Sequence, residues 1–175
     1  IISTAGVTPA NAGINADWAS FVTLVNLEFH NQFYGIKVGR TDNFWARDIY
    51  IKDTGKAGNS SQSGYSAVSP QANAYAIYWS ALGTGVFDNI VAHNGSDLAY
   101  RAAAGVCMIE GDGLIFSNCD FICFSYPFFI NVPDGVTVEN IFAHDCNWDI
   151  GQQAVRIVRS GTTGLAKSIL FRDCW

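Results

Sequence analysis

Apolar and polar residues alternate in short stretches along this chain, and a polar residue, usually asparagine, interrupts each stretch near its middle. Alternation with a period of two predicts β-strands with one face buried. Six such stretches align: VTLVNLEFHN (22–31), FWARDIYIKD (44–53), GVFDNIVAHN (85–94), LIFSNCDFIC (114–123), VTVENIFAHD (136–145) and GLAKSILFRD (164–173). The fifth position of the six stretches is occupied by Asn26, Asp48, Asn89, Asn118, Asn140 and Ser168.

The phase of the alternation slips by one residue at this fifth position. In the first stretch, Leu24 precedes Asn26 by two residues, and Leu27 and Phe29 follow it by one and three. A left-handed or bridge conformation at the interrupting residue would bend the chain and keep both flanks facing inward. Asn and Asp adopt such conformations more easily than other residues that have a Cβ atom. We therefore predict a ladder of bends at these positions.

The interval between stretches has a shortest value that occurs twice. The interval from Asn26 to Asp48 is repeated from Asn118 to Asn140, and the other three intervals are longer. We interpret the short interval, about 22 residues, as one coil of a repeat. The longer intervals then consist of a coil plus inserted loops, at about 53–74, 94–104 and 145–153.

A further apolar strand precedes each of the last five bends, at 35–38, 76–79, 105–108, 127–130 and 154–157. A repeat of this length with three short strands per turn is typical of a solenoid. These features predict an all-β fold, a right-handed single-stranded parallel β-helix with three sheets, about 22 residues per coil and an asparagine ladder.

The pattern resembles the pectate-lyase-like β-helix superfamily. The segment YGIKVGRTDNFWARDIYIKDTG (34–55) resembles the β-helix bodies of bacteriophage tailspikes and polysaccharide depolymerases. The repeat occupies 1–175 as a single segment without terminal caps. We therefore expect this segment to belong to a longer chain.

Composition narrows the classes of partner. Apolar residues make up 49% of the chain and charged residues 14%, which argues against disorder. The net charge of -5 disfavours nucleic acid, because phosphate binding needs clustered cations. An anionic polysaccharide remains compatible with a local basic groove. No apolar run approaches the length of a membrane span, so membrane insertion is not expected.

Three carboxylates, those of Glu110, Asp112 and Asp134, are the predicted catalytic groups. The interval from Asp112 to Asp134 equals one coil, so the two lie at equivalent positions of consecutive coils, about 4.8 Å apart. When two carboxylates lie this close, repulsion between them raises the pKa of one. The pair then supplies the acid and the base that glycoside hydrolysis needs. The alternative is turn chemistry, because both aspartates precede glycine.

Outward positions of the third strand supply the predicted substrate-binding residues Lys37, Tyr78 and Arg156. A tyrosine stacks on a sugar ring, and a cation holds an acidic sugar. The alternative is an ordinary solvated face. The complete outward row contains Asn15, Lys37, Tyr78, Cys107, Phe129 and Arg156.

Neither the histidines nor the cysteines predict a metal site, and no cofactor is expected. His30, His93 and His144 share one position in the alignment. One coil lies between the members of each neighbouring pair, and in these coils the position is occupied by Lys52 and Ile122. Adjacent histidines then lie about 10 Å apart, too far to share one ion. Cys146 and Cys174 fall in consecutive coils, and stacking predicts either a disulfide or a reduced pair.

Three functions fit these features. The first is a virion-associated tailspike that attaches to the host and binds, or also depolymerises, bacterial surface polysaccharide. The second is a non-catalytic structural or adhesive β-helix. The third is a secreted cellular polysaccharide lyase or glycoside hydrolase, although the pectate lyase calcium signature and the polygalacturonase motifs are absent. Phe124, Tyr126 and Phe129 are expected to point outward, and such an exposed aromatic patch predicts a subunit interface, as in a homotrimer. The resemblance implies an extracellular location on a virion tail.

Overall fold

The computed structural model describes residues 2–3, 12–30, 32–54, 74–93, 104–149 and 153–175. This part of the chain is entirely β and contains no helix, so it holds no helix that could span a membrane. Its strands are β1 (Ile2–Ser3), β2 (Ala12–Asp17), β3 (Ser20–His30), β4 (Tyr34–Gly39), β5 (Asp42–Lys52), β6 (Tyr75–Ser80), β7 (Gly85–His93), β8 (Ala104–Ser117), β9 (Asp120–Ile122), β10 (Tyr126–Val132), β11 (Thr137–His144), β12 (Asn147–Asp149), β13 (Val155–Arg159) and β14 (Leu165–Arg172).

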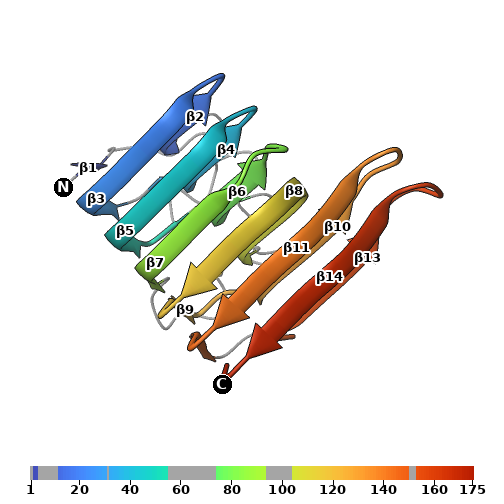
Figure 1. Ribbon diagram of the computed structural model, residues 1–175. Coiled ribbons are helices and arrows are strands. Elements are labelled where there is room, and N and C mark those ends of the chain that lie inside the picture. Colours follow the sequence, from blue (N-terminus) through green and yellow to red (C-terminus); the bar gives the residue numbers. More distant parts are fainter. Residues whose placement is uncertain (1, 4–11, 31, 55–73, 94–103, 150–152) are drawn as a thin grey trace, which may run out of the picture.

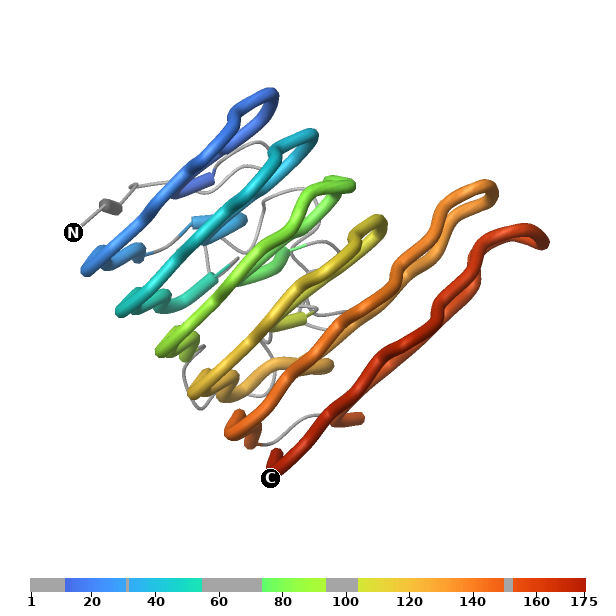
Figure 2. Tube along the Cα trace, viewed as in Figure 1, coloured from blue at the N-terminus to red at the C-terminus, as the bar shows by residue number. Residues whose placement is uncertain are grey.

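Every strand pairing in the described part is parallel. One set of paired strands, here called sheet A, contains β3, β5, β7, the C-terminal half of β8, β11 and β14, which run side by side in Figure 1. A second set, sheet B, contains β2, β4, β6, the N-terminal half of β8, β10 and β13. Successive windings follow one another from the N-terminus to the C-terminus (Figure 2). The parallel strands thus form a nearly closed, solenoid-like sheet.

The interior is filled by aligned apolar side chains. Phe87 and Phe116 lie parallel in adjacent windings, with ring centres 4.9 Å apart, and both are fully buried. Phe128 meets Phe116 edge-on across the interior at 5.2 Å. Trp79 is fully buried and donates a hydrogen bond from Nε1 to the Ala81 carbonyl. The predicted third strands are confirmed, because β4, β6, β8 and β10 cover their expected segments and β13 covers all of its segment except Ala154.

The predicted left-handed bends are confirmed at all six positions, with φ between 53° and 57°. Four of them also form the predicted column. The pairs flanking Asn26 and Asp48 are in register, as are those flanking Asp48 and Asn89. The pairs on either side of Asn89 and Asn118 are also in register.

Asn140 and Ser168 do not continue this column, so that part of the predicted ladder is wrong. The strand register places Asp145 beside Asn118, and Asp173 beside Asp145. Both aspartates have a left-handed φ, 52° and 51°. Asn140 lies instead beside Gly113, which is also left-handed, and Ser168 lies beside Asn140.

Most windings of sheet A therefore contain two left-handed bends five residues apart. The pairs are Phe21 and Asn26, Asn43 and Asp48, Gly113 and Asn118, Asn140 and Asp145, and Ser168 and Asp173. The shift arises in the turn between β10 and β11. Paired positions are offset by 22 between β8 and β10, as in Met108 with Ile130, but by 27 between β8 and β11, as in Leu114 with Ile141. Because this turn contains five extra residues, Asn140 aligns with the bend at Gly113, and Asp145 aligns with the bend at Asn118.

The expected loops fall largely outside the described residues. Residues 55–73, 94–103 and 150–152 are not described. Within the third expected loop, 145–153, Asn147–Asp149 forms strand β12, which pairs with β9.

Candidate functional site

The predicted substrate-binding residues lie in one row on the outer face of sheet B. The row runs across β2, β4, β6, β8, β10 and β13 and consists of Asn15, Lys37, Tyr78, Cys107, Phe129 and Arg156, as the alternation predicted. Lys37 and Tyr78 are direct neighbours in this row. Arg156 is three strands beyond Tyr78, about 14 Å away along the sheet. Lys37 and Tyr78 are therefore close enough to contact the same small group, whereas Arg156 is too far from Tyr78 to contact it as well.

A tyrosine cluster surrounds the centre of this row. The rings of Tyr75 and Tyr78 stack with centres 5.7 Å apart, and Tyr34 stacks on Tyr75 at 5.9 Å. The Lys37 ammonium lies 5.7 Å from the centre of the Tyr34 ring. Burial raises the pKa of all three tyrosines and raises the pKa of the Cys107 thiol to about 12. These groups therefore stay neutral at physiological pH and form an aromatic platform.

The Arg156 end of the row is a second aromatic–cation contact. The Arg156 guanidinium lies 4.9 Å from the centre of the Tyr126 ring and 5.7 Å from that of Phe129, and it donates a hydrogen bond to the Tyr126 hydroxyl. Tyr126 and Phe129 are half-buried on the outer face. The expectation that Phe124 points outward is wrong, because its side chain is fully buried in the core.

The predicted pairing of Asp112 with Asp134 is wrong. Asp112 lies beside Glu139 of β11 and accepts a hydrogen bond of 2.7 Å from the Asn140 side-chain amide. The five extra residues in the β10–β11 turn carry Asp134 out of register with Asp112. The two carboxylates therefore do not form an acid–base pair.

Asp134 holds a turn of the next winding. One of its carboxylate oxygens accepts hydrogen bonds from the backbone amides of Thr162 and Thr163 and from the Thr163 hydroxyl. The hydrogen bonds from Thr163, and then those from Thr162, lower the pKa of this exposed carboxyl. The turn chemistry that was the alternative to catalysis is the observed role of this residue.

Glu110 is placed by a β-bulge. Trp79 pairs with Met108, but the next residue, Ser80, pairs with Glu110, so Ile109 is an extra residue in β8. Bulges redirect side chains and are over-represented beside functional sites. Ser80 follows Tyr78 on the same face of β6 by two residues, about 7 Å along the strand. Glu110 thus lies next to the Lys37–Tyr78 part of the outer row.

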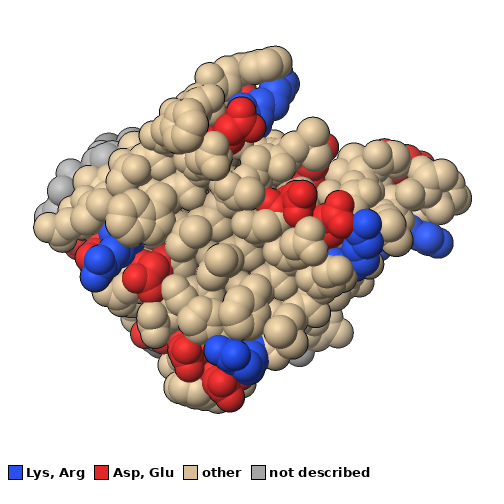
Figure 3. Space-filling model, viewed as in Figure 1, with Lys and Arg blue, Asp and Glu red and all other residues tan. Residues whose placement is uncertain are grey.

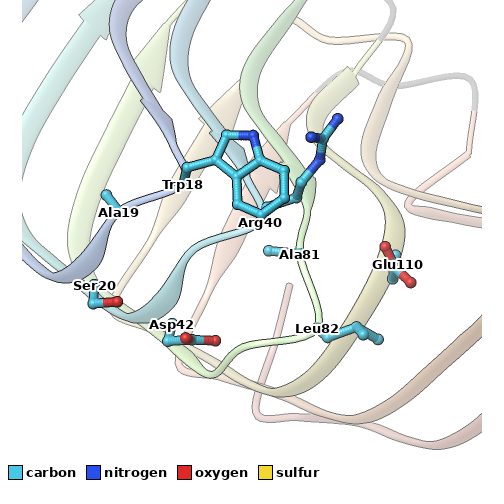
Figure 4. A pocket seen from close by; sticks show the side chains of 8 residues that line it. All are labelled: Trp18, Ala19, Ser20, Arg40, Asp42, Ala81, Leu82 and Glu110. Atoms are coloured by element: carbon cyan, nitrogen blue, oxygen red, sulfur yellow. The ribbon is translucent and has the colours of Figure 1, made fainter.

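Glu110 also lines a pocket where the strands of sheet B turn into sheet A (Figure 4). We call it the turn pocket; its volume is about 430 Å³. The pocket is lined by Trp18, Ala19, Ser20, Arg40, Asp42, Ala81, Leu82 and Glu110. Trp18 and Leu82 are 74% and 70% exposed, so two large apolar side chains stand open to solvent at its rim. The Arg40 guanidinium lies 4.5 Å from the centre of the Trp18 ring.

Hydrogen bonds between windings fix the backbone of this pocket. The Trp18 amide donates to the Gly39 carbonyl, the Arg40 amide to the Ser80 carbonyl, and the Asp42 amide to the Ala19 carbonyl. The buried Thr41 hydroxyl lies 2.9 Å from the Ala16 carbonyl oxygen and 3.0 Å from that of Gly39. Gly83 packs so closely that a Cβ atom there would lie 2.3 Å from the Thr41 carbonyl oxygen. The pocket is therefore preorganised by backbone contacts.

Two lining residues have an unfavourable backbone conformation. Trp18 and Arg40 are left-handed, with φ of 58° and 47°. This region costs a residue with a Cβ about 1–2 kcal/mol, and a bulky side chain there is uncommon. Strained residues cluster at functional sites, where the surrounding structure holds them in place.

Sequence reasoning identified Glu110 but missed Trp18, Arg40 and Asp42. One signal was present, because Trp18 and Arg40 are separated by one coil and are therefore equivalent in consecutive coils. Ala81 and Leu82 could not be placed in the pocket from the sequence, because their winding follows the long insertion before β6. The bulge at Ile109 has no signature in the alternation of β8.

The described residues contain no group of three metal-ligating side chains. His30 and His93 share the predicted row with Lys52 between them, but His144 does not join it. His144 pairs with Ser117, because of the shift in the β10–β11 turn.

The predicted stacking of Cys146 and Cys174 is confirmed by the strand register, and Cys119 extends the stack by one winding. All three are present as thiols. A hydrogen bond from Cys119 lowers the pKa of the Cys146 thiol, whereas burial raises that of Cys119.

No protein-family model matches the sequence, and no curated protein or solved structure is significantly similar to it. The geometry of the turn pocket and of the outer row of sheet B is therefore the basis for assigning a function.

Proposed function

We propose that this protein binds bacterial surface polysaccharide in the turn pocket, as a tailspike-type protein of a bacteriophage virion. The observation that carries the proposal is an exposed tryptophan stacked against an arginine beside two carboxylates, those of Asp42 and Glu110. An aromatic ring packs on the apolar face of a sugar, and carboxylates and guanidinium groups bind its hydroxyls. The Lys37–Tyr78 part of the outer row of sheet B extends this surface.

The finer fold assignment belongs to the same proposal. We place the chain among right-handed, three-sheet parallel β-helices of the pectate-lyase-like type, with a basic coil of about 22 residues. The register from β3 to β5 and from β8 to β10 supports that coil length, as in the pairing of Val22 with Phe44. The windings from β5 to β7 and from β6 to β8 are longer, as in the pairing of Ala46 with Phe87, and contain the insertions.

Depolymerisation is the second part of the proposal, with Glu110 as the acid and Asp42 as the partner carboxylate. Both line the turn pocket, whereas Asp134 is held in a different turn by Thr162 and Thr163. Asp112 follows Glu110 on β8 by two residues and is a further candidate. Glycosidases use two such carboxylates, one of which protonates the leaving oxygen.

The direct test is incubation with purified capsular polysaccharide and lipopolysaccharide. Binding is measured by co-sedimentation, hydrolysis by new reducing ends, and lyase action by absorbance of unsaturated uronate. We expect Trp18→Asn to lower binding and Glu110→Gln to abolish release of reducing ends without loss of binding. Glu139→Gln is the matched control, because Glu139 is ion-paired with Lys167 and does not line the pocket.

The outcomes separate the three functions. Binding without any cleavage product would identify the protein as an adhesive, non-catalytic β-helix. Unsaturated products identify a lyase and remove Glu110 as the acid of a hydrolase. Absence of binding to every glycan would contradict the proposal. Unchanged turnover in Asp112→Asn would remove Asp112 from the site.

A homotrimer is part of this proposal, with sheet A as the surface between copies. The outer face of sheet A carries an apolar row that crosses β5, β7, β8, β11 and β14, and Figure 3 shows this face as largely uncharged. Within this row Trp45 is 43% exposed and Leu170 is 55% exposed. Exposed apolar rows of this kind mark protein interfaces. Sedimentation equilibrium tests it, and a monomer at micromolar concentration would exclude the trimer.

A further inference from the structure

A second hollow adjoins the turn pocket along the edge of sheet A. Its volume is about 310 Å³, and it is lined by Ser20, Phe21, Asp42, Asn43, Gly83 and Thr84. Ser20 and Asp42 line both hollows. The two sites are therefore contiguous, with the Asp42 carboxylate between them.

Each hollow has its own exposed aromatic ring. Trp18 belongs to the first and is 74% exposed, and Phe21 belongs to the second and is 79% exposed. Both residues have left-handed backbones, with φ of 58° and 57°. Neither ring is buried enough to stabilise the fold in return for this strain. The bends themselves belong to the fold, because Asn43 is left-handed at the position equivalent to Phe21, and Arg40 at the position equivalent to Trp18. The choice of an exposed aromatic residue at each of these two bends points to a ligand for each ring.

Asp42 is the one acidic residue that lines both hollows. The first hollow contains the carboxylates of Asp42 and Glu110 and one cation, Arg40, whose guanidinium packs on Trp18. The second hollow has Asp42 and no cation among its lining residues. Ionised carboxylates accept hydrogen bonds from sugar hydroxyls, but they repel a carboxylate on the ligand.

Resting on the proposed function, we infer that the two hollows bind two consecutive uncharged sugar residues of a polysaccharide. Trp18 stacks on one sugar, Phe21 stacks on the next, and Asp42 accepts hydrogen bonds from hydroxyls of both. Acidic sugars of the same chain are excluded from these two positions and are left to the Lys37 side of the outer row.

The experiment compares acidic polysaccharides with their own neutral forms. Uronic acid-containing capsular polysaccharides are offered as purified and after carbodiimide–borohydride reduction of the carboxyl groups, together with a neutral capsule. The reduced forms keep the linkages and differ only in that each uronate carboxylate has become an uncharged hydroxymethyl group. We expect at least tenfold tighter binding of the reduced than of the native form wherever a uronate occupies the two hollows, and binding of the neutral capsule that changes little with salt.

Single and double substitutions test the two positions. Phe21→Asn and Trp18→Asn should each weaken binding of a neutral oligosaccharide about three- to tenfold, which is the scale of one aromatic contact. A disaccharide unit should lose affinity in both variants, whereas a single sugar should respond to one of them only. Trp175→Asn, at an exposed tryptophan outside both hollows and outside the apolar row of sheet A, should leave affinity unchanged.

Each result decides a separate question. If no polysaccharide binds in any form, the proposed function itself fails. If the native acidic forms bind more tightly than the reduced forms and Trp18→Asn abolishes that binding, the function stands and the inference is overturned. If Phe21→Asn has no effect on any neutral glycan that depends on Trp18, the second sugar position is overturned.

Discussion

The Arg40 guanidinium packs over the Trp18 ring at 4.5 Å, and both residues hold a left-handed backbone. This contact fixes an indole that is 74% exposed beside the turn pocket. A ring held in this way loses little side-chain entropy when a ligand stacks on it. The pocket therefore keeps its geometry at the expense of local backbone strain.

Relieving that strain should stabilise the protein. Asn adopts the left-handed region more easily than an aromatic residue, so Phe21→Asn should gain about 1 kcal/mol. Trp18→Asn should gain less, about 0.5 kcal/mol, because it also removes a cation–aromatic contact worth about 0.5–1 kcal/mol. Urea unfolding followed by circular dichroism measures both. Trp45→Asn, in a strand position without a left-handed φ, should show no gain, and a loss of stability in Phe21→Asn would contradict the interpretation.

Thr41 should matter through its hydroxyl rather than its volume. The hydroxyl lies within hydrogen-bonding distance of the Ala16 and Gly39 carbonyls, and Thr41 is fully buried. Thr41→Val keeps the shape and removes this hydrogen bond, which costs about 1 kcal/mol. The control is Thr23→Val on the exposed face of β3, where we expect a change within about 0.5 kcal/mol. Equal effects at the two positions would show that the buried hydroxyl is not important.

Gly83 should tolerate no side chain. A Cβ atom at Gly83 would lie 2.3 Å from the Thr41 carbonyl oxygen and 2.7 Å from the Asp42 Cα, and backbone atoms cannot move aside cheaply. Gly83→Ala should therefore cost about 1–3 kcal/mol and move the Asp42 turn. At Gly39 the nearest atom to a new Cβ is the Asp17 carboxylate oxygen at 3.1 Å, a flexible side chain. Thermal unfolding should show a clearly smaller loss for Gly39→Ala.

Acid should weaken the windings around Asp88. Its carboxylate accepts hydrogen bonds from the Asn118 amide at 2.9 Å and the Ser117 hydroxyl at 2.7 Å, and these bonds lower its pKa. A carboxyl whose folded pKa is below its unfolded value stabilises the fold above the unfolded pKa of about 4. That stabilisation is lost as the pH falls through the folded pKa.

The measurement is the difference in urea midpoint between the parent protein and Asp88→Asn from pH 6 to pH 2. We expect the parent to be more stable at pH 6 and the difference to shrink below about pH 4. Asp134, whose pKa is also lowered, is present in both proteins and cancels from the comparison. A difference that is independent of pH would show that the ionised form of Asp88 contributes nothing.

The alternation within each strand predicted much of the fold. The alignment of one winding with the next was harder to predict, because it depends on the lengths of the turns. Alternation alone placed Lys37, Tyr78 and Arg156 in one outward row, because strand side chains have a fixed period of two. The same logic misplaced Asn140, since GVFDNIVAHN and VTVENIFAHD have nearly the same pattern. Both kinds of bend accept asparagine, so residue type cannot distinguish the bend at Asn89 from the bend at Asn140.

The pocket was less accessible from the sequence than the row. Trp18, Arg40 and Ala81 come from three windings, and the third follows an insertion whose path the pattern does not specify. Glu110 was identified as a chemical group, but its position depends on the extra residue Ile109. Bulges arise from competition between neighbouring strands, which the sequence of one strand does not record.

The spacing of five residues between the two bends gives most windings of sheet A an internal translational symmetry. Shifting a strand such as β3 by five residues carries Val22 and Leu24 onto Leu27 and Phe29, so the apolar side chains still face inward. Insertions and deletions in steps of five are therefore nearly neutral for the core, and a lineage can lengthen a turn without redesigning the interior. During folding, a strand displaced by five residues would bury nearly the same apolar side chains as the correctly aligned strand. Contacts outside the core must therefore distinguish the correct alignment from the displaced one.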